Sequence, residues 1–359
     1  MTNVIYLVFE IISLIFLKLA YDNKTNCPKV MWKIKKSSIF LTISFIFLSS
    51  LVCFRGVEVG RDTQAYVNVF IRIVNGTASS VDLSWIGPGY RIICKTIGII
   101  FGSKYYILNF IIGFLTMYLF YKTIWENSNI PWLSMWIFIS TCLYFQTFNQ
   151  ARQMLAIAII FYSIKYIDEK KFKKYLIGVL LAASIHTSAI IMLPLYFIGR
   201  LEVNKKNITK YILLSIILYL GMIYIRKLLL MTTYGQIYFG TDYDVEGKTS
   251  TIVNLLVRII LLITTLILGN KEKKVQYKSL YNMAILCVIS QLLTINTYIF
   301  GRITTYFFTS FILLIPNVIP KKNNQLIQLI CFVAFALYYY VYYTSTASAM
   351  GVTIYKFFA

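Results

Sequence analysis

Long apolar runs recur along the whole chain, and they restrict its fold more than any other feature. Hydrophobic residues make up 58% of the 359 positions and charged residues only 13%. A helix needs about 20 mostly apolar residues to cross a bilayer. We therefore predict an all-α polytopic membrane protein, one integral domain over residues 1–359 with about ten transmembrane helices. The predicted spans are residues 4–20, 38–54, 105–124, 131–148, 154–167, 211–227, 252–268, 280–295, 303–319 and 325–343.

The net charge of +22 comes mainly from lysines that lie between the apolar runs. Loops rich in lysine stay on the cytoplasmic side of a membrane. The excess of lysine therefore indicates which loops face the cytoplasm. It does not indicate a nucleic-acid partner, and we expect none.

The only histidine, His186, lies in the middle of the apolar segment 175–198, which lysine-rich segments flank on both sides. A single crossing would place the two flanks on opposite faces of the membrane, although both are lysine-rich and are expected on the cytoplasmic face. The segment is long enough for one span of about 36 Å or for two half-helices. We predict a re-entrant hairpin with His186 on the wall of a cavity open to the outer face. A single span with an ordinary hydrogen-bonded histidine is the alternative.

This topology defines two outer loops, 55–104 with interfacial helices and 228–251. Arginine concentrates on the outer side, whereas lysine occupies the cytoplasmic loops. A guanidinium group holds phosphate or carboxylate oxygens with a planar fork of donors. The set therefore predicts a site for a phosphorylated or acidic ligand; lipid-headgroup anchoring and ion pairing are the alternatives. The arginines outside or near an outer end are Arg55, Arg61, Arg72, Arg91, Arg152, Arg226, Arg258 and Arg302.

Three further groups of polar residues are candidates for the same cavity. Asp62 either caps a helix that follows Gly60 or faces the cavity as a carboxylate. Asn149, Arg152 and Gln153 have helical spacing, so we predict that they share one face and contact a polyol or a phosphate. Arg302 precedes Tyr306 by one helical turn. In each of the last two groups, the polar side chains could instead hydrogen bond to other polar groups across the helix bundle.

Several chemistries have no support in the sequence. The six cysteines show no CxxC pairing, and one histidine cannot build a His-rich metal site, so we expect no metal and no disulfide framework. No Walker loop or GxGxxG motif is present. We therefore expect no cofactor.

The chain resembles the EpsG-like and Wzy-type bacterial polysaccharide polymerases. The resemblance is carried by Arg55 with residues 59–66 (VGRDTQAY), by 149–156 (NQARQMLA), by 186–189 (HTSA), and by Arg302 with Tyr306. Such proteins often have an acidic residue before a Pro-Gly-aromatic step, whereas this chain has Gly87 before Pro88. The departure leaves Asp62 as the candidate carboxylate.

The resemblance implies a metal-independent glycosyltransferase in the bacterial inner membrane with its active site facing outward. Its substrates would be undecaprenyl-pyrophosphate-linked oligosaccharide units, both as donor and as acceptor, for an O-antigen, a capsule or an exopolysaccharide. A flippase and a chain-length regulator would be partners. His186 would act as the base of an inverting transfer, with Asp62 as a second catalytic group. The residues that would hold pyrophosphate and glycan are Arg55, Arg61, Asn149, Arg152, Gln153, Arg302 and Tyr306. A lipid-linked glycan ligase, a flippase or transporter of lipid-linked sugars, and a membrane acyltransferase are the alternatives.

Overall fold

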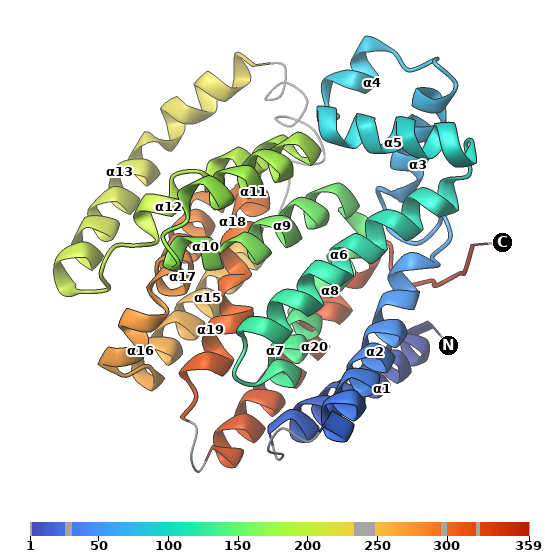
Figure 1. Ribbon diagram of the computed structural model, residues 1–359. Helices are drawn as coiled ribbons and strands as arrows, with labels where there is room; N and C mark the ends of the chain where they lie inside the picture. The colour runs from blue at the N-terminus through green and yellow to red at the C-terminus, as the bar shows by residue number, and fades with distance from the viewer. Residues whose placement is uncertain (1, 26–30, 233–247, 296–299, 321–323, 359) are drawn as a thin grey trace. The chain divides into compact units, whose positions relative to one another are not determined.

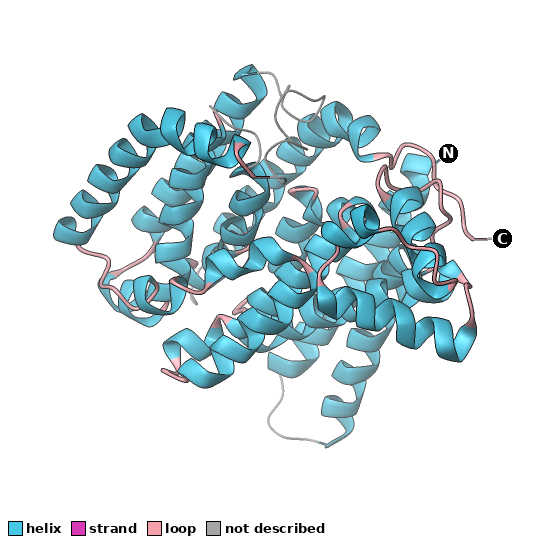
Figure 2. Cartoon of the chain, turned by 90° about the horizontal axis from the view of Figure 1, so that it is seen from above, coloured by secondary structure: helices cyan, strands magenta, loops and turns pink. Residues whose placement is uncertain are grey.

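The structure is a computed structural model that describes residues 2–25, 31–232, 248–295, 300–320 and 324–358. Every named element in these residues is a helix, as Figures 1 and 2 show. The all-helical class is therefore as predicted. The predicted loop 228–251 lies mostly outside the described residues.

Five described helices are long and apolar enough to cross a membrane. Their lengths exceed the requirement of about 20 residues for a span, and they establish a multi-pass membrane protein. The five helices are α1 (Thr2–Thr25), α2 (Met31–Cys53), α6 (Tyr105–Asn127), α15 (Lys248–Leu268) and α20 (Gln325–Met350).

Three of the other predicted spans are interrupted. Residues 131–148 form α7 (Pro131–Ser140) and α8 (Leu143–Asn149), which are separated by Cys142 in the left-handed region at a φ of 58°. Residues 154–167 fall in α9 (Ala151–Ser163) and α10 (Lys165–Asp168), and 303–319 in α18 (Phe300–Phe308) and α19 (Ser310–Val318). None of these pieces alone reaches the length of a span. The total of about ten spans stays a prediction.

The contacts within the chain divide it into two compact units. Unit 1 contains residues 1–163, 177–190 and 321–359, and unit 2 contains residues 164–176 and 191–320. In unit 1, a buried hydroxyl cluster joins three spans, because Ser13 of α1, Ser44 of α2 and Tyr121 of α6 are hydrogen bonded to one another. Such bonds hold helices together where lipid offers no polar partner.

In unit 2, the buried amide of Asn282 plays a similar part. Asn282 belongs to α17 (Lys278–Thr294), donates to the carbonyls of Gly199 and Leu201, and accepts from the Tyr211 hydroxyl at 2.6 Å. Tyr211 lies on α13, so this one side chain ties three parts of the unit together. Two further helices of this unit are α13 (Lys205–Leu230) and α16 (Lys271–Gln276).

The chain breaks its helical path at His186. Helix α11 (Phe172–Ile185) ends one residue before it, and a 3-10 helix η1 (Thr187–Met192) and the short α12 (Leu195–Ile198) follow. The rings of Phe172 and Tyr196 lie 4.9 Å apart, and the Tyr175 hydroxyl donates to the Met192 carbonyl at 2.6 Å. The end of the segment therefore returns to its beginning, with the apex near His186.

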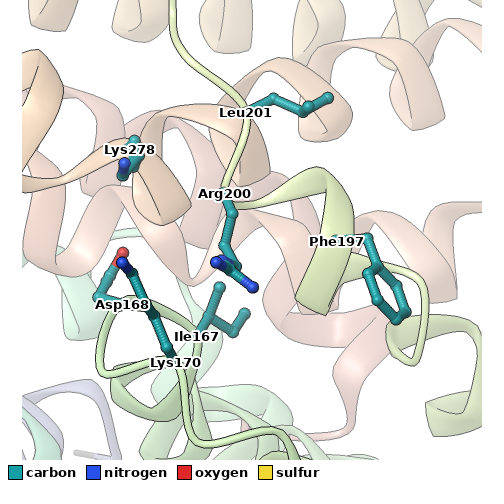
Figure 3. Close-up of a pocket in the computed structure, with 7 residues that line it drawn as sticks. All are labelled: Ile167, Asp168, Lys170, Phe197, Arg200, Leu201 and Lys278. Carbon is teal, nitrogen blue, oxygen red and sulfur yellow. The ribbon is translucent and has the colours of Figure 1, made fainter.

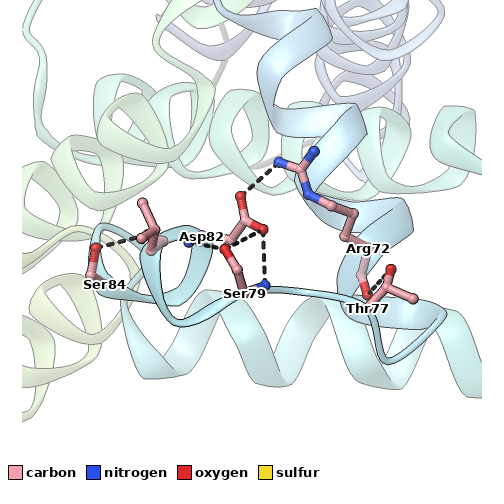
Figure 4. A network of polar contacts seen from close by, with 6 residues as sticks. Arg72, Thr77, Ser79, Asp82 and Ser84 are labelled. Carbon is pink, nitrogen blue, oxygen red and sulfur yellow. Dashed lines mark hydrogen bonds and ion pairs between the residues drawn. The ribbon is translucent and has the colours of Figure 1, made fainter.

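The segment between α2 and α6 forms α3 (Thr63–Val74), α4 (Ser80–Ser84) and α5 (Pro88–Phe101). Ser79 begins α4 with a capping box: its hydroxyl accepts from the Asp82 N–H, and its own N–H donates to Asp82. Asp82 also pairs with Arg72 at 2.7 Å, which connects α3 to α4 (Figure 4). One carboxylate therefore organises the connection between these helices.

Asp82→Asn is expected to loosen this connection. The Ser79 N–H and hydroxyl, followed by Arg72, lower the pKa of Asp82. A carboxyl group whose pKa is lowered on folding stabilises the fold above its unfolded pKa, and this contribution is lost as the pH falls through the folded value. Hydrogen exchange should therefore be faster at residues 79–84 in the variant at pH 7, and the wild-type protein should approach the same rates in acid. Asp22→Asn, which removes the exposed pair with Lys18, is the control; equal rates in wild type and Asp82→Asn at pH 7 would contradict this role.

Candidate functional site

Arg152 lies in a cage of aromatic rings within unit 1. The residue is only 5% exposed. Its guanidinium carbon lies 4.5 Å from the ring centroid of Trp85, 4.9 Å from that of Tyr66 and 5.4 Å from that of Tyr90. Nη1 donates to the Trp85 carbonyl at 3.2 Å, whereas the buried Nε has no hydrogen-bond partner among the described residues. The rings stabilise the cation without neutralising it.

The helix that carries Arg152 does not continue back to Asn149, so the predicted single polar face is wrong. Gln150 has non-helical angles, a φ of −94° and a ψ of 49°, and it separates α8 from α9. Arg152 and Gln153 are buried in the first turn of α9. Asn149 ends α8, and its Oδ1 accepts from the Asp62 N–H at 2.9 Å. Asn149 therefore fixes the start of α3.

The prediction that Asp62 caps a helix is only half correct. Helix α3 does begin after Asp62, but the Asp62 side chain makes no capping hydrogen bond, because its backbone is already helical. Gly60 makes the preceding turn at a φ of +92°, as expected, and its Cα lies so close to the Phe148 carbonyl that a Cβ would clash with it. The Arg61 N–H donates to the Met350 carbonyl. The backbone of this turn is thus packed between α8 and the end of α20.

A second guanidinium, that of Arg55, is buried directly after α2. The residue is 1% exposed, and Nη1 donates to the Val52 carbonyl. Burial lowers the pKa of Arg55 to about 10, and the nearby Cys53, Tyr355 and Tyr90 partly offset this effect. The side chain therefore stays charged at neutral pH. Its Nε has no hydrogen-bond partner in the described part of the chain.

Tyr90 lies within reach of both charges. It is 3% exposed, and burial raises the pKa of its hydroxyl, while Arg152 and Arg55 act in the opposite direction. We call Arg55, Arg152, Tyr66, Trp85 and Tyr90 the two-arginine cluster. Neither guanidinium forms an ion pair with any carboxylate in the ranges that the structure describes. A buried charge without a counterion typically costs several kcal/mol, so the cluster is suited to receive an anion.

The apex of the His186 segment packs against the N-terminus of α5. A Cβ at Gly87 would lie 2.3 Å from the Ser184 carbonyl oxygen, and one at Gly89 would lie 2.2 Å from the Ser184 hydroxyl. His186 is 9% exposed and follows two residues later. The backbone between Trp85 and Tyr90 thus contacts Arg152 and the last turn of α11, which brings His186 to the neighbourhood of the two-arginine cluster.

Gly87→Ala is expected to disturb both the two-arginine cluster and the segment around His186. The φ and ψ of Gly87, −63° and 150°, suit alanine, so the obstacle is steric: the added Cβ would meet the backbone of Ser184 and Ile185. Overpacking of this kind typically costs about 1–3 kcal/mol. We expect a lower thermal unfolding midpoint and a loss of activity. Gly221→Ala is the matched control, because nothing lies within 4 Å of its Cβ and alanine favours a helix. Equal behaviour of the two variants would show that this contact is unimportant.

The remaining candidates are Arg302 and Tyr306. Arg302 and Tyr306 share α18, as their spacing predicted, and Tyr306 is fully buried. They belong to unit 2, so their convergence with Arg152 stays a prediction. Sequence reasoning missed Tyr66, Trp85 and Tyr90 as partners of Arg152. Of these, Tyr66 and Tyr90 had a signal, since Tyr66 ends the 59–66 motif and Tyr90 is the aromatic residue of the Pro-Gly-aromatic step. Groups of three His, Cys, Asp or Glu side chains suited to a metal do not occur in the described residues.

Comparison with known proteins gives one match. No curated protein and no solved structure matches the chain significantly. A sequence model of the EpsG family matches residues 38–357, which include the two-arginine cluster and His186. EpsG-like proteins are similar to Wzy-type polymerases of polysaccharide biosynthesis. Because the match covers nearly the whole chain, this protein belongs to the EpsG family.

Proposed function

We propose that this protein is a polysaccharide polymerase that joins lipid-pyrophosphate-linked oligosaccharide units on the outer face of the bacterial plasma membrane. Family membership and the five apolar helices support a polymerase-like membrane protein. The observation that carries the finer proposal is the pair of buried guanidinium groups without carboxylate partners, Arg55 and Arg152. A pyrophosphate would supply the missing negative charge.

The transfer requires stabilisation of the leaving group. The acceptor hydroxyl oxygen bonds to the anomeric carbon of the donor while the bond from that carbon to the pyrophosphate oxygen breaks. The negative charge that develops passes to undecaprenyl pyrophosphate, and fixed cations stabilise it. Arg152 is held by its rings in one orientation, so little reorganisation is needed when the charge appears. The Tyr90 hydroxyl, which interacts electrostatically with both arginines, would donate a hydrogen bond to the same group.

The acceptor hydroxyl must also lose its proton. His186 is the candidate base: it would take the proton of the acceptor hydroxyl, while the oxygen of that hydroxyl attacks the anomeric carbon from the face opposite the leaving group, so that the anomeric configuration inverts. The lysine-rich flanks and the return of Tyr196 to Phe172 support a re-entrant hairpin that opens outward. Asp62 and Arg61, at the turn before α3, and Gln153 would complete the site. Arg302 and Tyr306 would contribute from unit 2.

The experiment is an extension assay with the purified full chain in lipid nanodiscs. Radiolabelled repeat units on undecaprenyl pyrophosphate serve as donor and acceptor. We expect a ladder of products that differ by one repeat unit, with release of one undecaprenyl pyrophosphate at each step. Transfer to a different lipid acceptor would indicate a ligase instead. Translocation of unextended units, or transfer of an acyl group, would also overturn the proposal.

A further inference from the structure

A second cationic site lies in unit 2, and none of the residues that line it is among those proposed for polymerisation. It is a pocket of about 310 Å³, a volume at the small end of the range for ligand sites. The end of α10, the end of α12 and the start of α17 form its walls. Its lining residues are Ile167, Asp168, Lys170, Phe197, Arg200, Leu201 and Lys278 (Figure 3).

The charges in this pocket favour an anion. Lys170, Arg200 and Lys278 supply three cations against the single carboxylate of Asp168, and none of the three forms an ion pair in the described ranges. Asp168 accepts a hydrogen bond from the Ser279 hydroxyl at 2.5 Å, and burial raises its pKa. Two other carboxylates adjoin lining residues in the sequence: Glu169 is paired with Lys171 at 2.7 Å, and Glu202 accepts a hydrogen bond from the Asn204 side chain at 3.3 Å. The pocket therefore keeps a net positive charge.

Arg200 adds a geometric argument. It is the single arginine of nine that we place in a lysine-rich cytoplasmic loop. Lysine would suffice for topology, whereas a guanidinium presents the fork that matches two phosphate oxygens. Its guanidinium lies 5.5 Å from the ring centroid of Tyr196, which limits its freedom. Figure 3 shows it pointing into the pocket above Ile167.

The rest of the lining is apolar and partly open. Phe197 is 63% exposed and Leu201 is 42% exposed. Such side chains beside a cationic pocket suit a ligand that carries an anionic group next to a hydrocarbon chain. Free phosphate would satisfy the cations but would leave these side chains uncovered.

We propose that this pocket binds the phosphate of an anionic lipid headgroup at the cytoplasmic face of the membrane. The lipid phosphate contacts Arg200, Lys170 and Lys278, and its chains cover Phe197 and Leu201. The proposal does not rest on the polymerase function, because no residue of the two-arginine cluster takes part.

Binding to the purified full chain in neutral detergent tests the proposal. The probes are short-chain phosphatidylglycerol, short-chain phosphatidylcholine and inorganic phosphate, each titrated separately. Phosphatidylglycerol should bind in preference to the other two, and Arg200→Gln should weaken its binding by about tenfold, the loss of one charge-assisted contact. Lys170→Gln should act in the same direction; both replaced side chains are exposed, so both variants should fold.

Lys206→Gln provides the matched control. Lys206 is an exposed lysine on α13 outside the pocket lining, and its loss changes the net charge equally. Unchanged binding in Lys206→Gln supports a specific site. If all three variants bind phosphatidylglycerol equally weakly, the lipid is attracted only by the net positive charge of the protein, and the proposal is overturned. Inorganic phosphate that binds as tightly as phosphatidylglycerol, with the same dependence on Arg200, would assign the pocket to a soluble phosphate and overturn the lipid assignment.

Discussion

Arg152→Ala is expected to lower the rate of chain extension by roughly two to three orders of magnitude, the usual loss when one fixed donor to a developing oxyanion is removed. The loss should appear in kcat more than in KM, because the charge on the leaving pyrophosphate grows only as the bond breaks. Truncation also empties the space between Trp85 and Tyr90, so the folded fraction of the variant must be measured alongside its rate.

Arg152→Lys separates charge from geometry. A lysine keeps the positive charge but lacks the planar fork and stacks less well on aromatic rings. We expect the lysine variant to remain folded and to lose most of its activity. Full activity would mean that a point charge suffices at this position, and the assignment of a bidentate role would then be wrong.

Arg258→Lys is a closely matched control for this substitution. Like Arg152, Arg258 donates to one backbone carbonyl, that of Asn254 at 3.0 Å, and its guanidinium lies 5.1 Å from the ring centroid of Phe308. Arg258 belongs to unit 2 and is not among the arginines named in the proposed site. Any activity lost merely by replacing an arginine that rests on a ring should therefore appear in both variants. A selective loss in Arg152→Lys identifies the ligand-binding role.

The sequence predicted Arg152 as a candidate for binding an anion, but it did not predict which residues surround Arg152. Guanidinium groups in the predicted outer segments indicated an anion site, and Arg152 was among them. The ring of Trp85 and the backbone carbonyl that Arg152 contacts are 67 positions away in the chain. Local periodicity contains no information about such a contact. The complete burial of Arg55 was hidden for the same reason, since its neighbours Tyr90 and Tyr355 come from distant segments.

The helix interruptions show a second limit of sequence reasoning. Cys142 and Gln150 each lie between two helices, yet neither is a glycine or a proline, and most residues of 131–148 are apolar. Hydropathy therefore predicted a continuous span over 131–148. Tertiary packing overrides weak local propensity at such positions. The helix break at His186 lies where the charge of the flanking segments, and not local propensity, had placed the middle of a re-entrant hairpin. The hairpin itself stays a prediction.

His186→Ala is expected to reduce extension by about two to four orders of magnitude, which is the typical contribution of a general base. The backbone at this point is fixed by bonds that the substitution does not touch: the His186 N–H donates to the Ala182 carbonyl, and its own carbonyl accepts from Ala189. We therefore expect the variant to fold and to bind its lipid-linked substrates. Ile190→Ala, in the same 3-10 helix and 49% exposed, controls for loosening of this turn.

A purely structural role for His186 predicts a different outcome from catalysis. If the side chain accepts the proton of the acceptor hydroxyl, added imidazole should restore part of the activity of His186→Ala and have no effect on Ile190→Ala or on Arg152→Ala. A base supplied from solution replaces a missing proton acceptor but cannot repair a displaced backbone or a missing cation. Undiminished extension by His186→Ala would remove the histidine from the mechanism. A strong loss without any rescue, together with a lowered unfolding midpoint, would reassign it to holding the apex of the segment in place.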